Sequence, residues 1–182
     1  MPQSFSRSRP VARPPRGALV FDSSKVDSTI GPLSVWRDFM SGRLAGFEYH
    51  ADDRAPFYGK VVSMDLGPLR INHVDCSGGR WSRLPCHLAD GRESYNLCTS
   101  IDSAYRLSQG PADLVRGPGE FVLIDNARPS ECVVERGGVD YEIVIPRESL
   151  NAARRGRDAT AETPIDGKSQ PLRLLRAYVQ SI

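Results

Sequence analysis

Histidine and paired cysteines are scarce in this 182-residue sequence. The only histidines, His50, His73 and His87, are scattered, so each is expected to be an ordinary surface or hydrogen-bonded side chain. The four cysteines lie far apart, with no CxxC pair and no histidine at zinc-finger spacing. These absences exclude a zinc finger and predict reduced, mostly buried thiols.

Long hydrophobic runs are also missing. No apolar stretch approaches the roughly 18 residues that a membrane-spanning helix needs, and none near the N-terminus has the length of a signal-peptide core. Prolines at positions 2, 10, 14 and 15 oppose the amphipathic helix of a transit peptide. We therefore predict a cytoplasmic protein without membrane contact, whose Arg- and Pro-rich residues 1–30 are disordered.

The sequence has little excess of charge of either sign. Arg7, Arg9, Arg13 and Arg16 precede the first acidic residue, Asp22, which leaves 20 basic and 22 acidic residues in the rest of the chain. A strongly basic surface is the usual footprint of nucleic-acid binding. The slightly acidic body is therefore not expected to bind DNA by itself.

Catalytic motifs are absent as well. No Gly-x-Ser-x-Gly elbow occurs, no cysteine has a neighbouring histidine, and Gly117-x-Gly119 is too short for a dinucleotide loop. The pair Asp52-Asp53 has the character of a solvated turn. The sequence offers no positive reason to predict an enzyme.

Short β-like runs dominate what is present. Trp36 and Met40 lie on a predicted amphipathic helix and are expected to pack onto the domain. After this helix, apolar runs alternate with turns such as Leu66-Gly67-Pro68 and Asp90-Gly91. We predict strands at residues 59–66, 69–74, 81–87, 95–101, 105–107, 113–115, 121–125, 132–135 and 141–145. This pattern predicts a mainly β fold with flanking helices, in which residues 31–150 form one domain as a sandwich or barrel.

The C-terminal part, residues 151–182, is predicted to be a linker followed by a helix. On that helix Leu172, Leu175 and Val179 share one face, and a helix this short is marginal alone in water. We therefore predict that these three residues face a second copy of the chain or the barrel wall, and that the protein is a homodimer.

The spacing of a cupin motif survives in the middle of the chain without its metal ligands. From Gly91, the positions of the two histidines hold Leu97 and Thr99, and the position of the glutamate holds Ser103. Val122 stands where the second motif has its histidine. Because a transition-metal site needs several imidazole or carboxylate donors, we predict a barrel with no metal and no cofactor.

Several segments resemble the effector-binding domains of bacterial AraC/XylS-type transcription regulators. They are WRDFM at 36–40, FYGKV at 57–61, LGPLRI at 66–71, PGEFVLIDNARP at 118–129 and IPRESL at 145–150. The resemblance implies a cupin-like (jelly-roll) barrel that binds a small-molecule effector and helices that dimerise. It also implies that DNA is contacted only through a C-terminal pair of helix-turn-helix motifs, a domain we expect to be absent because the sequence stops where it should begin.

The predicted ligand site lies inside the barrel. Tyr95, Leu97 and Thr99 share one face of a strand, and the cupin spacing points Leu97 and Thr99 inward together with Val122. Trp81 and Arg83 are further candidates. Arg83 suits a carboxylate effector, but the alternative is an ion pair at the barrel rim, which most half-buried arginines form. Tyr95 and Trp81 have the alternative of plain core aromatics.

Three functions remain in competition at this point. The first is the sensing and dimerisation domain of a regulator, and the second is a small cupin enzyme such as an isomerase or dioxygenase. The third is an interaction module that antagonises a full-length regulator. Metal analysis separates the second from the others, and a helix-turn-helix segment downstream would separate the first from the third.

Overall fold

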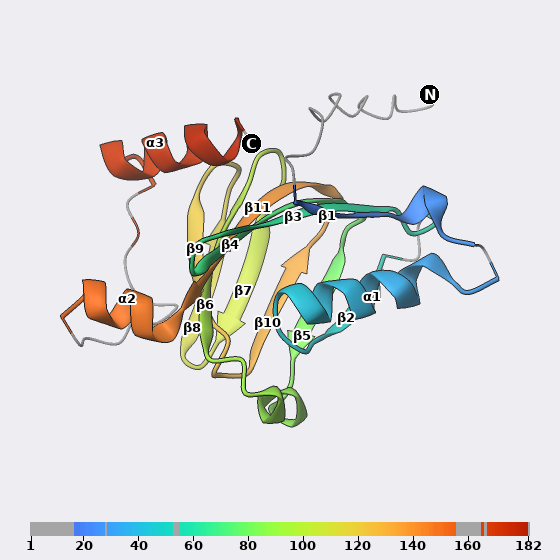
Figure 1. Ribbon diagram of the computed structural model, residues 1–182, viewed down its shortest axis with the longest axis horizontal. Coiled ribbons are helices and arrows are strands. Elements are labelled where there is room, and N and C mark those ends of the chain that lie inside the picture. The colour runs from blue at the N-terminus through green and yellow to red at the C-terminus, as the bar shows by residue number, and fades with distance from the viewer. Residues whose placement is uncertain (1–16, 28, 53–54, 156–164, 166, 182) are drawn as a thin grey trace.

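The computed structural model describes residues 17–27, 29–52, 55–155, 165 and 167–181 (Figure 1). Two antiparallel sheets face each other and form the body of the molecule. The predicted mainly β fold with flanking helices is confirmed. None of its described helices is long and apolar enough to cross a membrane.

The larger sheet has six strands in the order β1-β3-β4-β11-β6-β9. Their bounds are Leu19–Asp22 (β1), Gly59–Leu66 (β3), Leu69–Cys76 (β4), Gly138–Pro146 (β11), Ser94–Ser100 (β6) and Phe121–Asp125 (β9).

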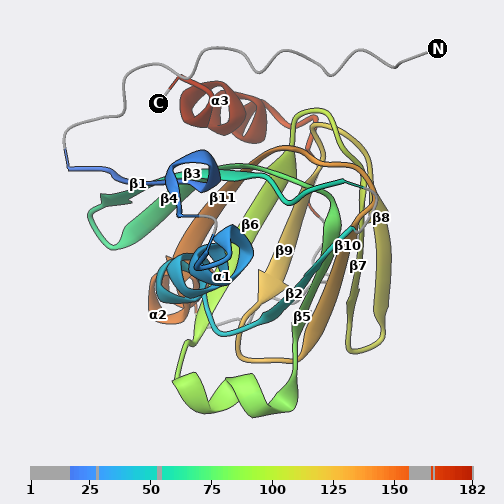
Figure 2. The same cartoon turned by 90° about the vertical axis from the view of Figure 1, so that its right-hand side faces the viewer.

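The smaller sheet has five strands in the order β2-β5-β10-β7-β8. Their bounds are Glu48–Ala51 (β2), Gly79–Arg83 (β5), Ser130–Val134 (β10), Tyr105–Gln109 (β7) and Ala112–Arg116 (β8). Figure 2 shows the two sheets closing around a common interior.

The N-terminal segment is more ordered than predicted. Residues 1–16 lie outside the described residues, but β1 pairs with β3, and the 3-10 helix η1 (Ser23–Lys25) follows it. The prediction of disorder up to residue 30 is therefore wrong from β1 onward. Backbone pairing with the edge of β3 and burial of Phe21 supply the stabilisation that composition did not reveal.

The predicted strand at residues 81–87 is also wrong beyond Arg83. The chain leaves the sheet there because Pro85 has no N–H to donate to a ladder, and the 3-10 helix η2 (Pro85–Asp90) begins. Strand β2 was missed because Glu48–Ala51 contains no β-branched residue. It forms by pairing with β5.

Helix α1 (Pro32–Arg43) covers one end of the barrel through Trp36 and Met40, both fully buried. Pro32 starts the helix, where a missing N–H costs nothing. The ring of Trp36 lies 4.7 Å from that of Tyr49 and 4.8 Å from that of Trp81, measured between centroids. The predicted packing role of Trp36 and Met40 is confirmed.

Helices α2 (Arg147–Ala153) and α3 (Gln170–Val179) lie against the outer face of the six-stranded sheet (Figure 1). Leu150 of α2 packs on Tyr95 and Leu123. Val179 and Leu175 of α3 pack on a cluster of Ile71, Tyr141 and Ile143. The six-stranded sheet is therefore covered on both faces, by the barrel interior and by these two helices.

Candidate ligand-binding cavity

A cavity of about 90 Å³ lies between the two sheets. Six strands and the segment between α1 and β2 contribute to its wall. The lining residues are Leu44, Ala45, Gly46, Phe47, Trp81, Arg83, Asn96, Cys98, Tyr105, Val122, Ile124, Asn126, Ser130, Cys132, Val134, Asp140 and Glu142.

The five-stranded sheet and the segment before β2 contribute an aromatic wall. The rings of Trp81 and Phe47 lie 4.8 Å apart between centroids, and both residues line the cavity. Cys132 stands opposite Trp81 in the register of β10 with β5, so it faces the same side. This wall is apolar, as the walls of most small-molecule sites are.

The six-stranded sheet contributes two carboxyl groups, Asp140 and Glu142, both on β11. Burial raises the pKa of Glu142 from 4.5 to about 8, and the nearby Asp140 carboxyl adds to this shift. Burial likewise raises the pKa of Asp140 to about 6, while Ser100 favours its ionised form. Burial thus favours the neutral form of both carboxyl groups, and the Asp140 carboxyl opposes the ionisation of Glu142.

Several polar atoms in the cavity wall have no hydrogen-bond partner among the described residues. They are Oδ1 of Asn96, the hydroxyl of Tyr105 and Oδ1 of Asp140. Asn96 is only 6% exposed and Tyr105 only 4% exposed. A buried polar group without a partner costs about 1–3 kcal/mol, and these atoms are free to form hydrogen bonds with a molecule in the cavity.

A hydrogen-bond chain runs from the cavity to α1. Asn72 Nδ2 donates to Glu142 Oε2 over 3.3 Å, and Ser63 Oγ donates to Asn72 Oδ1 over 2.6 Å. Arg43 Nε of α1 donates to Ser63 Oγ over 2.8 Å. The chain fixes the position of the Glu142 carboxyl group and joins it to the helix that covers the barrel end.

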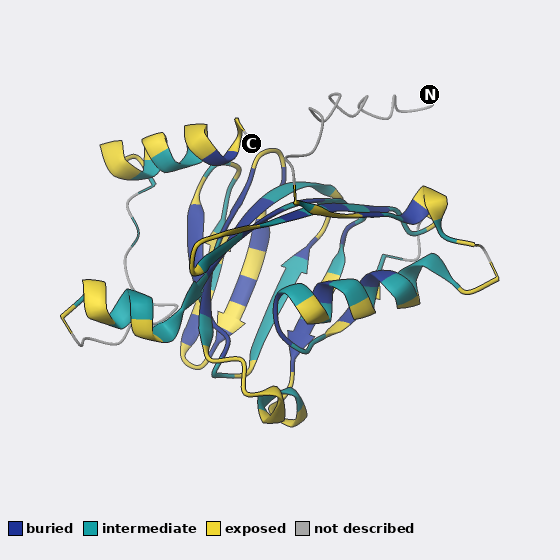
Figure 3. Ribbon diagram, in the orientation of Figure 1, coloured by how far each residue is buried: buried dark blue, intermediate teal, exposed yellow. Residues whose placement is uncertain are grey.

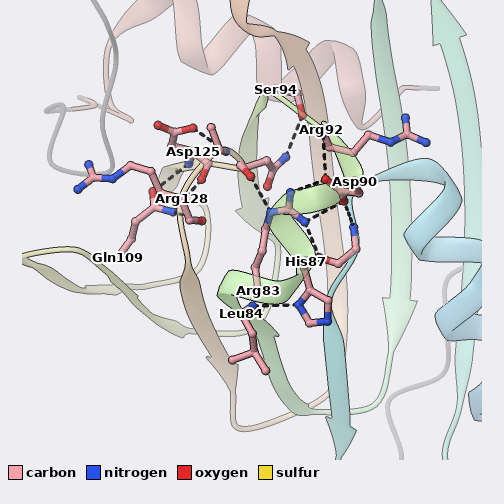
Figure 4. A network of polar contacts seen from close by, with 12 residues as sticks. Arg83, Leu84, His87, Asp90, Arg92, Ser94, Gln109, Asp125 and Arg128 are labelled. Carbon is pink, nitrogen blue, oxygen red and sulfur yellow. Dashed lines mark hydrogen bonds and ion pairs between the residues drawn. The ribbon is translucent and has the colours of Figure 1, made fainter.

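Arg83 lies at the edge of the cavity with its guanidinium occupied by protein groups (Figure 4). Its NH1 and NH2 bind the two carboxylate oxygens of Asp90 at 3.0 and 2.8 Å. Its Nε donates to the Asn126 carbonyl and its NH1 to the Gly46 carbonyl, both over 2.6 Å. Of the two alternatives for Arg83, the structure shows the ion pair.

The hydrogen bond from Arg83 holds the pKa of Asp90 well below its usual range. The Gly46 N–H also donates to Asp90, over 2.7 Å. Arg83 and Asp90 therefore tie three segments together, the turn before β2, the helix η2 and the turn after β9.

The family of the chain follows from its sequence, which matches the model of the AraC-binding-like domain over residues 36–182. The chain belongs to this family. The resemblance to AraC/XylS-type regulators is thereby confirmed, and the barrel is a cupin-like jelly roll. A search of curated proteins finds no match to the sequence.

Among solved structures, this AraC-binding-like domain is similar to the AraC-like transcriptional activator CuxR. The identity is 14% and the TM-score 0.72, and the match covers 91% of this chain and 59% of that one. An RmlC-like cupin from Shewanella frigidimarina shows 10% identity and a TM-score of 0.40, over 54% of this chain and 85% of the other.

Three of the residues predicted for the ligand site of this AraC-binding-like domain line the cavity: Trp81, Arg83 and Val122. Tyr95, Leu97 and Thr99 do not. They project from the opposite face of β6, where Tyr95 and Leu97 pack with Leu123. The expectation that Leu97 and Thr99 point inward is wrong, because the inward-facing residues of β6 are the alternate ones, Asn96 and Cys98. A shift of one residue along a strand moves every side chain to the opposite face.

Tyr95 instead anchors α2 on the outer face of the sheet. Its hydroxyl accepts a hydrogen bond of 2.6 Å from Arg147 NH1, whose guanidinium carbon lies 4.5 Å from the centre of the tyrosine ring. Arg147 also forms an ion pair with Asp125. Of the two alternatives for Tyr95, the structure favours the structural one.

The sequence analysis missed Asn96, Tyr105, Asp140 and Glu142. The signal that would have found them is a polar residue in the middle of a strand, such as Glu142 between Tyr141 and Ile143. Burial of a carboxyl group at such a position is costly, so it points to a specific interaction of that group. Among the residues described, no three His, Cys, Asp or Glu side chains come together as metal ligands would.

Proposed function

We propose that this chain is the effector-sensing domain of an AraC/XylS-type transcription regulator, and that a small molecule binds in the cavity without a metal ion. The observation that carries the proposal is the cavity itself, because its wall presents buried polar atoms without protein partners in an AraC-binding-like domain. In this proposal the domain senses its ligand and catalyses no reaction.

DNA contact in such a cytoplasmic regulator is proposed to come from a helix-turn-helix domain. The chain spans 59% of the CuxR chain that it matches. The sequence after residue 16 has 20 basic and 22 acidic residues. This slight excess of acidic residues disfavours contacts with DNA phosphates in this part of the protein.

Filling the cavity is expected to abolish ligand binding while the fold persists. In Cys98→Phe, the larger ring would project from β6 into the cavity. Fragments of six to nine non-hydrogen atoms would be screened by two-dimensional NMR. Hits on the wild type should shift the resonances of Trp81, Asn96 and Tyr105, and those shifts should disappear in the variant.

The matched control is Val115→Phe, which adds the same ring to a β8 position that is 62% exposed. It should leave every hit unchanged. A screen without hits in the cavity, or hits that persist in Cys98→Phe, would contradict the proposed function.

Self-association is the second part of the proposal, and we assign it to α3. The predicted dimerisation residues Leu175 and Val179 pack on the sheet of their own chain, and Leu172 is half-buried. Figure 3 shows that much of the outer part of α3 is exposed. Beside its buried face, Leu174 is 64% exposed and Tyr178 is 49% exposed, one turn apart. Two such stripes related by a two-fold axis would bury each other.

Leu174→Glu is expected to convert a dimer into a folded monomer, because it places a charge in the centre of that contact. Light scattering and circular dichroism would measure association and folding together. Arg173→Ala, an exposed neighbour on the same helix, should leave the dimer intact. A wild-type monomer, or a dimer in both variants, would remove α3 from the interface.

A further inference from the structure

We infer that the ligand of this cavity is a small organic cation, an ammonium or amidinium group on a short apolar body, whose charged end lies between Asp140, Glu142, Asn96 and Tyr105. The inference rests on the proposed function and specifies the chemical class of its ligand. Four features of the cavity support it.

The first feature is the kind of hydrogen-bonding atom that faces the cavity. The unpartnered atoms are a carboxylate oxygen of Asp140, an amide oxygen of Asn96 and the hydroxyl of Tyr105. The carboxyl group of Glu142 lines the same space. Carboxylate and amide oxygens accept hydrogen bonds, so the complementary ligand group is rich in N–H donors.

The second feature is charge. Arg83 is the only cationic side chain among the described residues that line the cavity, and Asp90 already neutralises it. Asp140 and Glu142 have no such counter-ion in the wall. Two neighbouring carboxyl groups with no cation beside them repel an anionic ligand and attract a cationic one.

The third feature is the aromatic wall opposite the carboxyl groups. Trp81 and Phe47 lie on the other side of the interior from β11. Aromatic faces attract cations, and the rings also cover the apolar part of a short alkyl or aryl amine. A polyol would gain the hydrogen bonds but would leave this wall without an apolar partner.

The fourth feature is size. A buried water needs roughly 10–15 Å³ of comparable space, so a cavity of about 90 Å³ admits a ligand of about six to nine non-hydrogen atoms. That range includes short alkylamines and benzylamine. It excludes a nucleotide at this site.

Proton release should accompany binding, because an incoming cation favours the ionised form of both carboxyl groups. Affinity for an amine should therefore rise about tenfold between pH 6 and pH 8, a range in which the amine itself stays protonated. Burial keeps the thiols of Cys98 and Cys132 and the hydroxyl of Tyr105 neutral in this range, by raising the pKa of each. Asp75 on β4 and Asp102 after β6 raise the pKa of Asp140, and Asp140 raises that of Glu142. The two carboxyl groups in turn act on the neighbouring titratable groups, which are Cys76 on β4, Cys98 on β6, Tyr105 on β7 and Cys132 on β10.

The test compares three molecules of nearly equal shape, benzylamine, benzyl alcohol and benzoate, by titration calorimetry and NMR on the full chain at pH 8. Benzylamine should bind in the cavity at least about tenfold more tightly than the alcohol, and benzoate should not bind. Glu142→Gln and Asp140→Asn should each weaken the amine by about tenfold and leave the alcohol unchanged. Glu131→Gln, an exposed carboxyl group on β10, is the control and should change neither.

The outcomes separate the two proposals. If the alcohol or the carboxylate binds in the cavity as tightly as the amine, the cation inference is overturned and the proposed sensing function stands. If none of the three binds and the fragment screen also gives no cavity hit, both are overturned. Amine binding that is unaffected in both carboxyl variants, with their spectra showing an intact fold, overturns the assignment to Asp140 and Glu142.

Discussion

Replacing Arg83 with methionine is expected to lower the free energy of unfolding by about 3 kcal/mol. Arg83 is 5% exposed, and its guanidinium binds the Asp90 carboxylate and the carbonyls of Gly46 and Asn126. Methionine fills similar space but removes the hydrogen bonds that Arg83 donates to all three of these acceptors. Urea denaturation at pH 7 measures the change.

Arg80→Met is the matched control, because Arg80 also lies on β5 and forms an ion pair with Glu131, but in an exposed position. Its effect should stay below about 1 kcal/mol. Equal losses in the two variants would show that burial of Arg83 contributes nothing.

The Arg83 variant should also change the acid sensitivity of the protein. The folded-state pKa of Asp90 lies below its usual 3.8, so this carboxylate stabilises the fold at higher pH, and the contribution is lost as the pH falls below about 4. In Arg83→Met that acid-dependent loss should become smaller.

Glu142→Gln is expected to stabilise the protein by about 2 kcal/mol at pH 8 and to have little effect at pH 4. The pKa of Glu142 is raised from 4.5 to about 8 in the folded state. The folded protein therefore holds this proton while the unfolded chain releases it. Wild-type stability should decline as the pH rises from about 4.5 to 8, and the glutamine should remove most of that decline.

Urea denaturation curves at pH 4, 6 and 8 would measure the effect. The amide of glutamine can still accept the hydrogen bond from Asn72, so the packing of the site is preserved. Glu131→Gln serves as the exposed control on β10. Parallel pH profiles of wild type and Glu142→Gln would show that this carboxyl group is ionised in the folded protein.

Most of the strand pattern was predictable from the sequence. The predicted strands at 59–66 and 121–125 coincide with β3 and β9. Gly67, with a φ of 59°, forms the left-handed turn between β3 and β4, a conformation that other residues rarely adopt. Such turns and strands are local, because they depend on residues that are neighbours in the chain.

The sequence did not predict which face of β6 points into the barrel, because both faces of the strand are buried. Period-2 alternation separates Tyr95, Leu97 and Thr99 from Asn96 and Cys98, but it does not say which set is inside. The apolar set faces the helices and the more polar set faces the cavity. Only the packing of α2 and α3 on the outer face decides this.

The sequence by itself thus determined the family, the mainly β fold and the burial of Trp36 and Met40, since these depend on local patterns and ordered motifs. The tertiary structure alone decided which polar groups meet. Arg83 binds carbonyls 37 and 43 residues away, and Asp140, Glu142, Asn96 and Tyr105 gather from three strands around one cavity. Such sites depend on the pairing of distant strands, and no spacing in the chain encodes that pairing locally.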